Sequence, residues 1–333
     1  MKKAFLLLLC TVILAVALVF PSCGGKGLYS EGNGKIKIVA TTFAPFDLAR
    51  QVAKGNASFT VLQTSGADLH NYAPTAEALK ALTEADIFIC VGGISDEAWL
   101  EKTLLSADNP ELTVIKMVNF AEPLVTELEG HTHSDYCEAH HTHKHDEHHH
   151  GDGHDHEGDE HVWTSLKVAM KVTEAIALAC AEKDPENSES YLNNAKAYGN
   201  ELAELDSQYA EAVNASETKT LVFADRFPFI YLTSDYGICH YSAFSGCSSE
   251  SESSFATFVR LSEAIEASKS GYVLITENGD TGLPDALGEQ TGCKTLRLHS
   301  MQSVSRGEIE DGATYLEIMK SNLKTLKTAL GCE

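Results

Sequence analysis

Histidine is the residue type in this sequence that is best suited to do chemistry. Of the 15 histidines, 12 fall between His131 and His161, among many acids, a single lysine and almost no large apolar residues. The clusters at 140–145 and 148–150 offer interchangeable imidazole ligands of the kind that suits Zn²⁺, Cu²⁺ or Ni²⁺. A stretch this polar cannot bury a core, so we expect a surface loop. The composition favours loose binding of several ions over a merely solvated loop.

Two further positions could hold an ion in a fixed geometry. His70 lies in the turn Gly66–Thr75, between a strand and a helix expected to start near Thr75. His161 ends the histidine-rich loop, just before a helix expected over Leu166–Ala181. A single histidine at a helix start is usually a cap or a surface residue. Two at such corners, one with a chelating loop attached, favour a metal site.

The elements that must position these histidines follow an α/β pattern. Short apolar runs alternate with helical segments, which predicts lobes with mainly parallel sheets. Each set of runs is too small for one large sheet and large enough for a compact lobe. The expected strands are Ile36–Thr42, Phe59–Leu62, Ile87–Val91 and Thr113–Val118 in a first lobe, then Leu221–Ala224, Tyr272–Thr276 and Thr295–Leu298 in a second.

Between the two sets of strands, apolar residues recur at steps of three and four from Glu186 to Ser216. This spacing predicts one amphipathic helix about 45 Å long, at 1.5 Å per residue. The alternative is two helices broken at Gly199. A glycine costs only about 1 kcal/mol inside a helix, so we favour the continuous helix.

The amino terminus indicates export. Lys2 and Lys3 precede an uncharged apolar run, Ala4–Phe20, and a small residue stands before Cys23. This is typical of a secretory signal with a lipoprotein-type cleavage site, and it predicts an acylated Cys23 at the membrane, outside the cytoplasm, in the periplasm or at the cell surface. The alternative is one membrane-spanning helix, because the run is close to the ~20 residues that span a bilayer.

Charge and cysteine content narrow the possible partners. The formal net charge is -23, and removal of residues 1–22 takes away two lysines and no acids, which gives -25. Such an acidic chain disfavours nucleic acid and anionic substrates and favours cations. No other apolar run could span a membrane, so the chain can bind cargo but cannot be a channel. The cysteines include no C-x-x-C pair, although Cys239 and Cys247 could form one local bridge.

From about Lys35 to Leu330 the chain resembles the zinc and manganese substrate-binding lipoproteins of ABC transporters. The motifs are specific in their order and spacing: Val39–Pro45, Gly66–Thr75, Ala85–Ile87, Gly92–Gly93, Trp99–Leu100, the histidine-rich loop, His161–Trp163 and Ser248–Phe255. The resemblance implies two α/β lobes with mainly parallel sheets, joined by one long rigid helix, and a metal site in the cleft between them. The expected divisions are a signal peptide (1–22), a lipid-anchored tether (23–34), an N-terminal lobe (35–185) with the histidine-rich loop (131–161), a linking helix (186–216) and a C-terminal lobe (217–333).

The resemblance also maps metal-ligand roles onto residues of this chain. In the first lobe these are His70 and His161. The family places a histidine or glutamate just after the first strand of the second lobe, but here that position is Ala224. Asp225 is a candidate one residue later, although the adjacent Arg226 could pair with it.

Two more candidates end strands of the second lobe. Glu277 follows the strand Tyr272–Thr276 and resembles the acidic fourth ligand of the family. His299 closes the strand Thr295–Leu298 at the sheet edge where ligands gather in open α/β folds. The predicted ligands are therefore His70, His161, Glu277 and His299.

We expect an extracytoplasmic high-affinity receptor that delivers a divalent metal to the permease of an ABC transporter. Imidazole ligands favour zinc, with manganese as the other choice. Binding should weaken below about pH 6.5, because an imidazole must lose its proton to bind, and the long helix should limit lobe movement. A metal buffer or adhesin without a transporter is the alternative. An enzyme is disfavoured, because the nearest string to the zinc-hydrolase motif H-E-x-x-H, His156–His161, has its histidines five apart.

Overall fold

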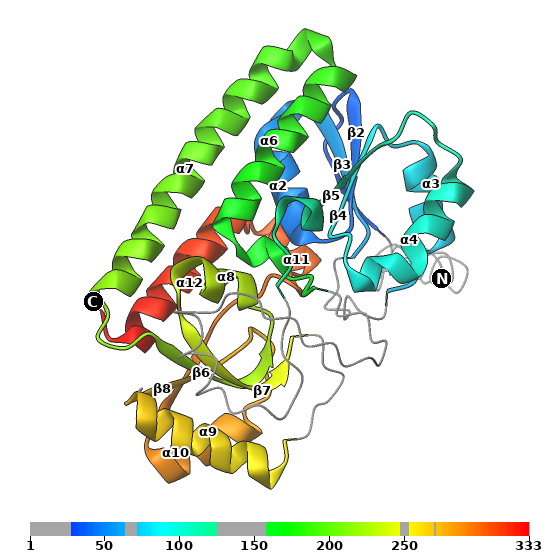
Figure 1. Ribbon diagram of the computed structural model, residues 1–333. Coiled ribbons are helices and arrows are strands. Elements are labelled where there is room, and N and C mark those ends of the chain that lie inside the picture. Colours follow the sequence, from blue (N-terminus) through cyan, green and yellow to red (C-terminus); the bar gives the residue numbers. More distant parts are fainter. Residues whose placement is uncertain (1–27, 64–71, 125–157, 247–252, 270, 333) are drawn as a thin grey trace, which may run out of the picture.

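Two α/β lobes, each with its own sheet, make up the computed structural model of the chain (Figure 1). The structure describes residues 28–63, 72–124, 158–246, 253–269 and 271–332. The predicted signal sequence with Cys23, the candidate ligand His70 and nearly all of the histidine-rich loop lie outside the described residues. Among the residues that are described, no helix is both long and apolar enough to cross a membrane.

The N-terminal sheet has five strands in the order β1-β3-β2-β4-β5. Four of them run parallel, and β1 is antiparallel to β3. The four strands predicted for this lobe are confirmed to within two residues at each end. The strands are β1 (Tyr29–Glu31), β2 (Ile36–Ala40), β3 (Ala57–Val61), β4 (Ile87–Cys90) and β5 (Thr113–Lys116).

The predicted tether at 23–34 is too long, because residues 29–31 form strand β1 and belong to the sheet of the N-terminal lobe. Tyr29 is buried and meets the ring of Phe46 edge to face, with centroids 5.8 Å apart. Gly32 then turns the chain with φ +79°, and a Cβ there would lie 2.6 Å from the carbonyl oxygen of Ala57. A three-residue strand with one buried side chain is too short to produce a period-2 pattern, so the sequence did not reveal it.

Helices cover both faces of this sheet, as alternating side chains require. Ile87 and Ile89 of β4 join the core on one face with α2 and α6, whereas Phe88 joins the core on the other face with α3 and α4. The helices are α2 (Phe43–Ala53), α3 (Ala76–Thr83), α4 (Ile94–Ala107) and α6 (Leu166–Lys183).

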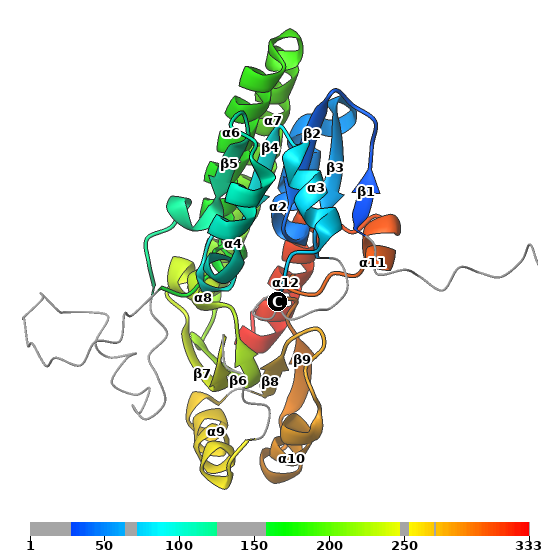
Figure 2. The same ribbon diagram turned by 90° about the vertical axis from the view of Figure 1, so that its right-hand side faces the viewer.

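The C-terminal sheet has four parallel strands in the order β7-β6-β8-β9 (Figure 2). Three of them were predicted, but the edge strand β7 was not, because its sequence CHYSAFS mixes polar and apolar residues. Helices α9 and α10 pack on one face, while α8 and α12 lie toward the other lobe. The elements are β6 (Thr220–Phe227), α8 (Ile230–Tyr236), β7 (Cys239–Ser245), α9 (Phe255–Ser268), β8 (Tyr272–Ile275), α10 (Gly282–Thr291), β9 (Lys294–Arg297), α11 (Arg306–Glu310) and α12 (Tyr315–Leu330).

One helix, α7 (Ser188–Ala215), runs alongside the N-terminal lobe and ends at the C-terminal lobe, so it crosses from one lobe to the other as predicted. It has 28 residues and passes through Gly199 without a break. Its buried side chains recur at the predicted steps, from Tyr191 to Val213, and they pack against both lobes. In Figure 1 it lies beside α6 at one end and α12 at the other.

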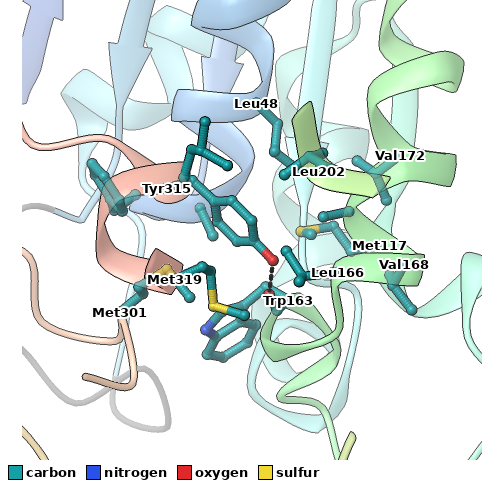
Figure 3. Packing of buried hydrophobic residues seen from close by; sticks show 14 of the residues in the cluster. Leu48, Met117, Trp163, Leu166, Val168, Val172, Leu202, Met301, Tyr315 and Met319 are labelled. Atoms are coloured by element: carbon teal, nitrogen blue, oxygen red, sulfur yellow. Dashed lines mark hydrogen bonds between the residues drawn. The ribbon is translucent and has the colours of Figure 1, made fainter. Parts of the chain in front are cut away.

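The two lobes share one apolar core at their junction (Figure 3). Tyr315 at the start of α12 is fully buried, and its hydroxyl donates to the carbonyl of Trp163 at 2.8 Å. The indole Nε1 of Trp163 donates in turn to the carbonyl of Ser300 at 2.8 Å. The backbone nitrogen of Tyr315 donates to Asp47 of α2 at 2.7 Å, so the last helix is fixed to the first lobe.

We predict that Gly199→Ala stabilises the protein by about 0.5–1 kcal/mol, because alanine favours the helix and reduces the freedom of the unfolded chain. A Cβ at this position would meet nothing within 4 Å. Denaturant unfolding measures the change. Gly32→Ala is the matched control and should destabilise, because of its positive φ and the approach to Ala57. A destabilised Gly199→Ala protein would contradict a continuous α7.

The first turn of α4 contains a buried acid. Asp96 is 4% exposed, and its Oδ2 accepts from the backbone nitrogen of Gly92 at 2.7 Å. Burial, more than the nearby carboxylate of Glu160, raises the pKa of Asp96 to about 6. The folded protein therefore binds this proton more tightly than the unfolded chain does, and its stability falls as the pH rises from about 4 through 6.

We predict that Asp96→Asn removes this loss. Asparagine has the shape of the protonated acid, so the variant and the wild type should have similar unfolding free energies near pH 4. Toward pH 7 the variant should become the more stable of the two, because only the wild type then buries a charge. Urea unfolding of both proteins with chelator present, across this range, measures the difference. A difference that does not change with pH would contradict the raised pKa.

Candidate metal site

The candidate site lies where loops of the two lobes meet, beside His161. This residue precedes the short 3-10 turn Val162–Thr164, which leads into α6. Two loops of the second lobe approach its ring. A Cβ on Gly246, just past β7, would lie 3.0 Å from Cε1, and the amide of Gln302, after β9, lies 2.7 Å from Nε2.

The imidazole of His161 is fully buried and held at both nitrogens. Oδ1 of Asp159 lies 2.8 Å from Nδ1 and also accepts from the backbone nitrogen of His161 at 2.8 Å. A neutral ring that donates from Nδ1 to this carboxylate has its lone pair on Nε2. The side-chain amide of Gln302 then donates to that lone pair. This is the tautomer that a histidine needs to bind a metal through Nε2.

Packing fixes the plane of this ring. The indole of Trp163 meets it edge to face, with centroids 5.1 Å apart. Gly246 lies against the ring, and any side chain there would also approach the carbonyl oxygen of Phe227, at 2.8 Å from its Cβ. Since the indole of Trp163 is hydrogen-bonded to the carbonyl of Ser300 in the second lobe, the orientation of His161 depends on the contact between the lobes.

Neither Asp159 nor Gln302 was among the predicted site residues. A carboxylate two residues before a candidate ligand is a usable signal, because such groups often orient a metal-binding histidine. It was hidden in a segment already rich in acids. For Gln302 no sequence signal existed, since a glutamine three residues after His299 is an ordinary loop residue.

The structure places Glu277 against the loop that follows β9. Its carboxylate accepts from the backbone nitrogen of Ser300 at 2.7 Å, from the Ser300 hydroxyl at 2.9 Å and from the Ser303 hydroxyl at 3.0 Å. These bonds close the turn from His299 to Ser303. In this arrangement the carboxylate stabilises the loop that carries Gln302.

His299 lies beside Glu277, with its Nδ1 3.6 Å from Oε1 of the acid. Its backbone is clamped by Asn322 of α12, which accepts from the nitrogen and donates to the carbonyl, each at 2.8 Å. Nδ1 also accepts from the backbone nitrogen of Met301 at 2.9 Å. A neutral ring in this state carries its proton on Nε2, so binding a metal through Nε2 requires a change of tautomer.

Asp225 and Ala224 contribute to the packing of the C-terminal lobe. Oδ2 of Asp225 accepts from the backbone nitrogen and the hydroxyl of Thr276, and Oδ1 accepts from the backbone nitrogen of Arg226. The acid therefore ties β6 to the end of β8. Ala224 is buried in the core under α9. Within the described residues no group of three or more histidine, cysteine, aspartate or glutamate side chains could hold a metal ion, and His70 is outside that set.

The residues on either side of segment 125–157, Leu124 and Asp159, are joined by hydrogen bonds near His161. The backbone nitrogen of Asp159 donates to the carbonyl of Leu124 at 2.6 Å. The hydroxyl of Tyr231 in α8 accepts from the nitrogen of Leu124 at 3.3 Å and donates to the carbonyl of Asp159 at 2.9 Å. The residue that orients His161 is therefore also the residue that closes the base of the histidine-rich segment.

Several buried polar atoms border segment 64–71, which contains His70. Of the described side chains, Oγ1 of Thr41, Nε2 of Gln63 and the hydroxyl of Tyr72 are buried without a hydrogen-bond partner. Oδ2 of Asp159, whose Oδ1 contacts the His161 ring, is also buried without a hydrogen-bond partner. Such atoms are costly unless something pairs with them, so this edge of the N-terminal sheet suits a polar or cationic ligand.

Comparison with known proteins agrees with the sequence resemblance. Residues 38–329 match the family model described as zinc-uptake complex component A, periplasmic. The chain is 31% identical to the zinc-binding lipoprotein AdcA of Streptococcus pneumoniae, over 98% of this chain and 61% of AdcA. It is 27% identical to the high-affinity zinc uptake system protein ZnuA of Bacillus subtilis, over 96% of each. The crystal structure of Zn(II)-bound AdcA from S. pneumoniae superposes with a TM-score of 0.69 at 29% identity, covering 90% of this chain and 59% of that one.

The chain spans about three fifths of the AdcA proteins and nearly the whole of ZnuA. The match to the family model covers most of the sequence, including both lobes and the linking helix. The chain belongs to the family of periplasmic zinc-uptake components A, which are solute-binding proteins and not enzymes.

Proposed function

We propose that this protein is an extracytoplasmic receptor that binds zinc between its two lobes and delivers it to the permease of an ABC importer. The observation that carries the proposal is the buried imidazole of His161, which Asp159 holds with its Nε2 lone pair toward the second lobe. A neutral imidazole fixed in this way is a suitable ligand for zinc. His70 is the proposed second ligand from the first lobe.

In the second lobe, the candidate metal ligands are occupied by hydrogen bonds to other groups of the same lobe. His299 and Glu277 hold the turn that carries Gln302, and Gln302 occupies the lone pair of His161. An ion at Nε2 of His161 has to displace this amide, and the turn then has to release His299 or Glu277 as a further ligand. We therefore propose that capture is a local rearrangement of the loop after β9, while the shared core keeps the lobes in place.

Zinc is the proposed cargo in preference to manganese, because imidazole nitrogen is the donor the site presents most plainly. The relatives AdcA and ZnuA are named as zinc proteins. A signal sequence with an acylated Cys23 would hold the receptor at the membrane beside its permease. The strong negative charge would attract cations to its surface.

The function is tested with the purified protein and its reconstituted importer. We predict one tightly bound zinc ion at the interlobe site, and a loss of affinity of more than about 100-fold for His161→Ala, since a ligand is removed. Titration against a zinc chelator should use a protein lacking residues 132–157, so that the histidine-rich segment adds no weak sites. Asp159 has to stay, because it orients His161.

Zinc-dependent stimulation of the importer's ATPase by the wild type, and its absence with His161→Ala, supports the receptor function. Tight zinc binding without stimulation would instead support a metal buffer or adhesin. Unchanged zinc affinity in His161→Ala would refute the interlobe site.

A second prediction concerns the orienting carboxylate. Asp159→Asn should weaken zinc binding by roughly 10- to 100-fold, as is usual when such a partner of a metal-binding histidine is changed. Asp225→Asn is the matched control, because this acid bonds Thr276 and not the site histidine. Its affinity should stay within about threefold of the wild type. Equal losses of zinc affinity in both variants, measured by the same titration, would mean that Asp225 is a ligand and that Asp159 has no specific role in orienting His161.

A further inference from the structure

Helix α4 begins without a capping side chain of its own. Its N-cap is Gly93, which has no side chain that could accept a hydrogen bond from the first turn. A Cβ on Gly93 would lie 2.4 Å from the Cβ of Glu160 and 2.7 Å from its Oε2. The glycine therefore leaves room for Glu160, which is 1% exposed and directly precedes the candidate ligand His161.

The carboxylate of Glu160 caps α4 in place of a local residue. Its Oε2 accepts from the backbone nitrogen of Ser95 at 3.0 Å, and its Oε1 accepts from the Ser95 hydroxyl. Ser95 is the second residue of the helix, so its N–H has no acceptor within the helix and is a usual partner of a cap. A carboxylate also suits the positive end of the helix dipole. This cap joins parts of the first lobe that lie 65 positions apart in sequence.

The peptide that carries His161 is held from three sides. The backbone nitrogen of Asp159 donates to the carbonyl of Leu124 beside the histidine-rich segment. The ring of His161 meets the amide of Gln302 in the second lobe. Glu160 supplies a bond to a helix of the first lobe. Since Glu160 and His161 are adjacent in the chain, any shift of Glu160 relative to α4 also moves the imidazole.

Helix α4 also contacts a residue close in sequence to the other proposed ligand of the first lobe. The indole of Trp99 meets the ring of Tyr72 edge to face, with centroids 5.2 Å apart. Tyr72 follows His70 by two positions. Trp99 comes about one helical turn after Ser95. One short stretch of α4 therefore contacts residues that are near both proposed first-lobe ligands in sequence.

We propose that Glu160 is a positioning residue of the metal site. By capping α4 it fixes the peptide of His161 to the first lobe, so that the imidazole is already in place when zinc arrives between the lobes. Both oxygens of its carboxylate are bonded to Ser95, so Glu160 acts through His161 and not as a ligand. The inference rests on the proposed function, because the role is defined by zinc binding at His161.

Zinc titration of the protein lacking residues 132–157 tests this role. Glu160→Ala should weaken zinc binding by about tenfold or more, because a metal-binding histidine depends on the groups that position it. Asp96→Asn is the matched control. It also removes a buried acid from the first turn of α4, but this acid binds the backbone nitrogen of Gly92 and not the site peptide. Its zinc affinity should stay close to that of the wild type. Unchanged affinity in Glu160→Ala, or equal losses in both variants, would overturn the proposal.

Ser95→Ala gives a milder change at the same contact, because it removes the hydroxyl and keeps the backbone bond. It should weaken zinc binding by about two- to fivefold, the effect of losing one hydrogen bond. In the Glu160→Ala background it should have no further effect, since the bond is already absent there. Equal effects of Ser95→Ala in both backgrounds would overturn the proposal.

The His161 ring provides a readout that needs no zinc. In the metal-free wild type, proton–nitrogen NMR correlations should show one neutral ring protonated on Nδ1, as the bond to Asp159 requires. His161→Ala identifies these signals. They should shift or double in Glu160→Ala and stay unchanged in Asp96→Asn. A loss of stability in urea with unchanged ring signals and zinc affinity would mean that Glu160 only stabilises the first lobe, which would refute the positioning role.

The two proposals can fail separately. If His161→Ala kept its zinc affinity, the interlobe site would be refuted, whatever the ring signals of Glu160→Ala showed. If His161→Ala lost its affinity while Glu160→Ala kept both its affinity and its ring signals, only the positioning role of Glu160 would be refuted.

Discussion

The contact between Trp163 and the C-terminal segment is the interaction on which the rest of this structure depends. Trp163 is buried two residues after His161, donates to Ser300 and accepts from Tyr315. Loss of either partner would leave a buried polar group unpaired, which costs about 1–3 kcal/mol. The peptide that carries the site histidine is thus fixed by the lobe it faces. The position of the ion site therefore depends on how the two lobes pack.

This arrangement explains why the two halves of the proposed site differ. In the first lobe the carboxylate of Asp159 leaves His161 in the tautomer that a metal needs, and the ring of Trp163 fixes the plane of the imidazole. In the second lobe the candidate donors stabilise their own turn, with Glu277 bound to Ser300 and Ser303. One preformed donor faces a loop that can exchange hydrogen bonds for metal bonds. Such exchange needs movement of a loop and no hinge, which agrees with a core and a helix that continue from lobe to lobe.

The described residues that flank the histidine-rich segment meet beside the candidate ligand His161. Leu124, Asp159 and Tyr231 close the segment next to His161, so the acid that orients the ligand also starts the chelating chain.

The sequence by itself determined the architecture of the protein and the chemistry of its cargo. Short apolar runs predict seven strands, because strands of a sheet covered on both faces are largely apolar. The recurrence of apolar residues at steps of three and four predicts α7, because a helix buries one face. The order and spacing of the motifs from Val39–Pro45 to Ser248–Phe255 identify the family, and imidazole chemistry points to a transition metal.

Only the tertiary structure decided which polar groups meet. The interpretation of Glu277 and His299 as ligands rested on their places at strand ends, but hydrogen bonds to neighbouring loops decide whether those groups are available. Gln302 reaches His161 across 141 positions in sequence, and Asp225 turns toward Thr276. Sequence spacing sets only which contacts the chain can reach, whereas the packing of two lobes against each other selects the contacts that form.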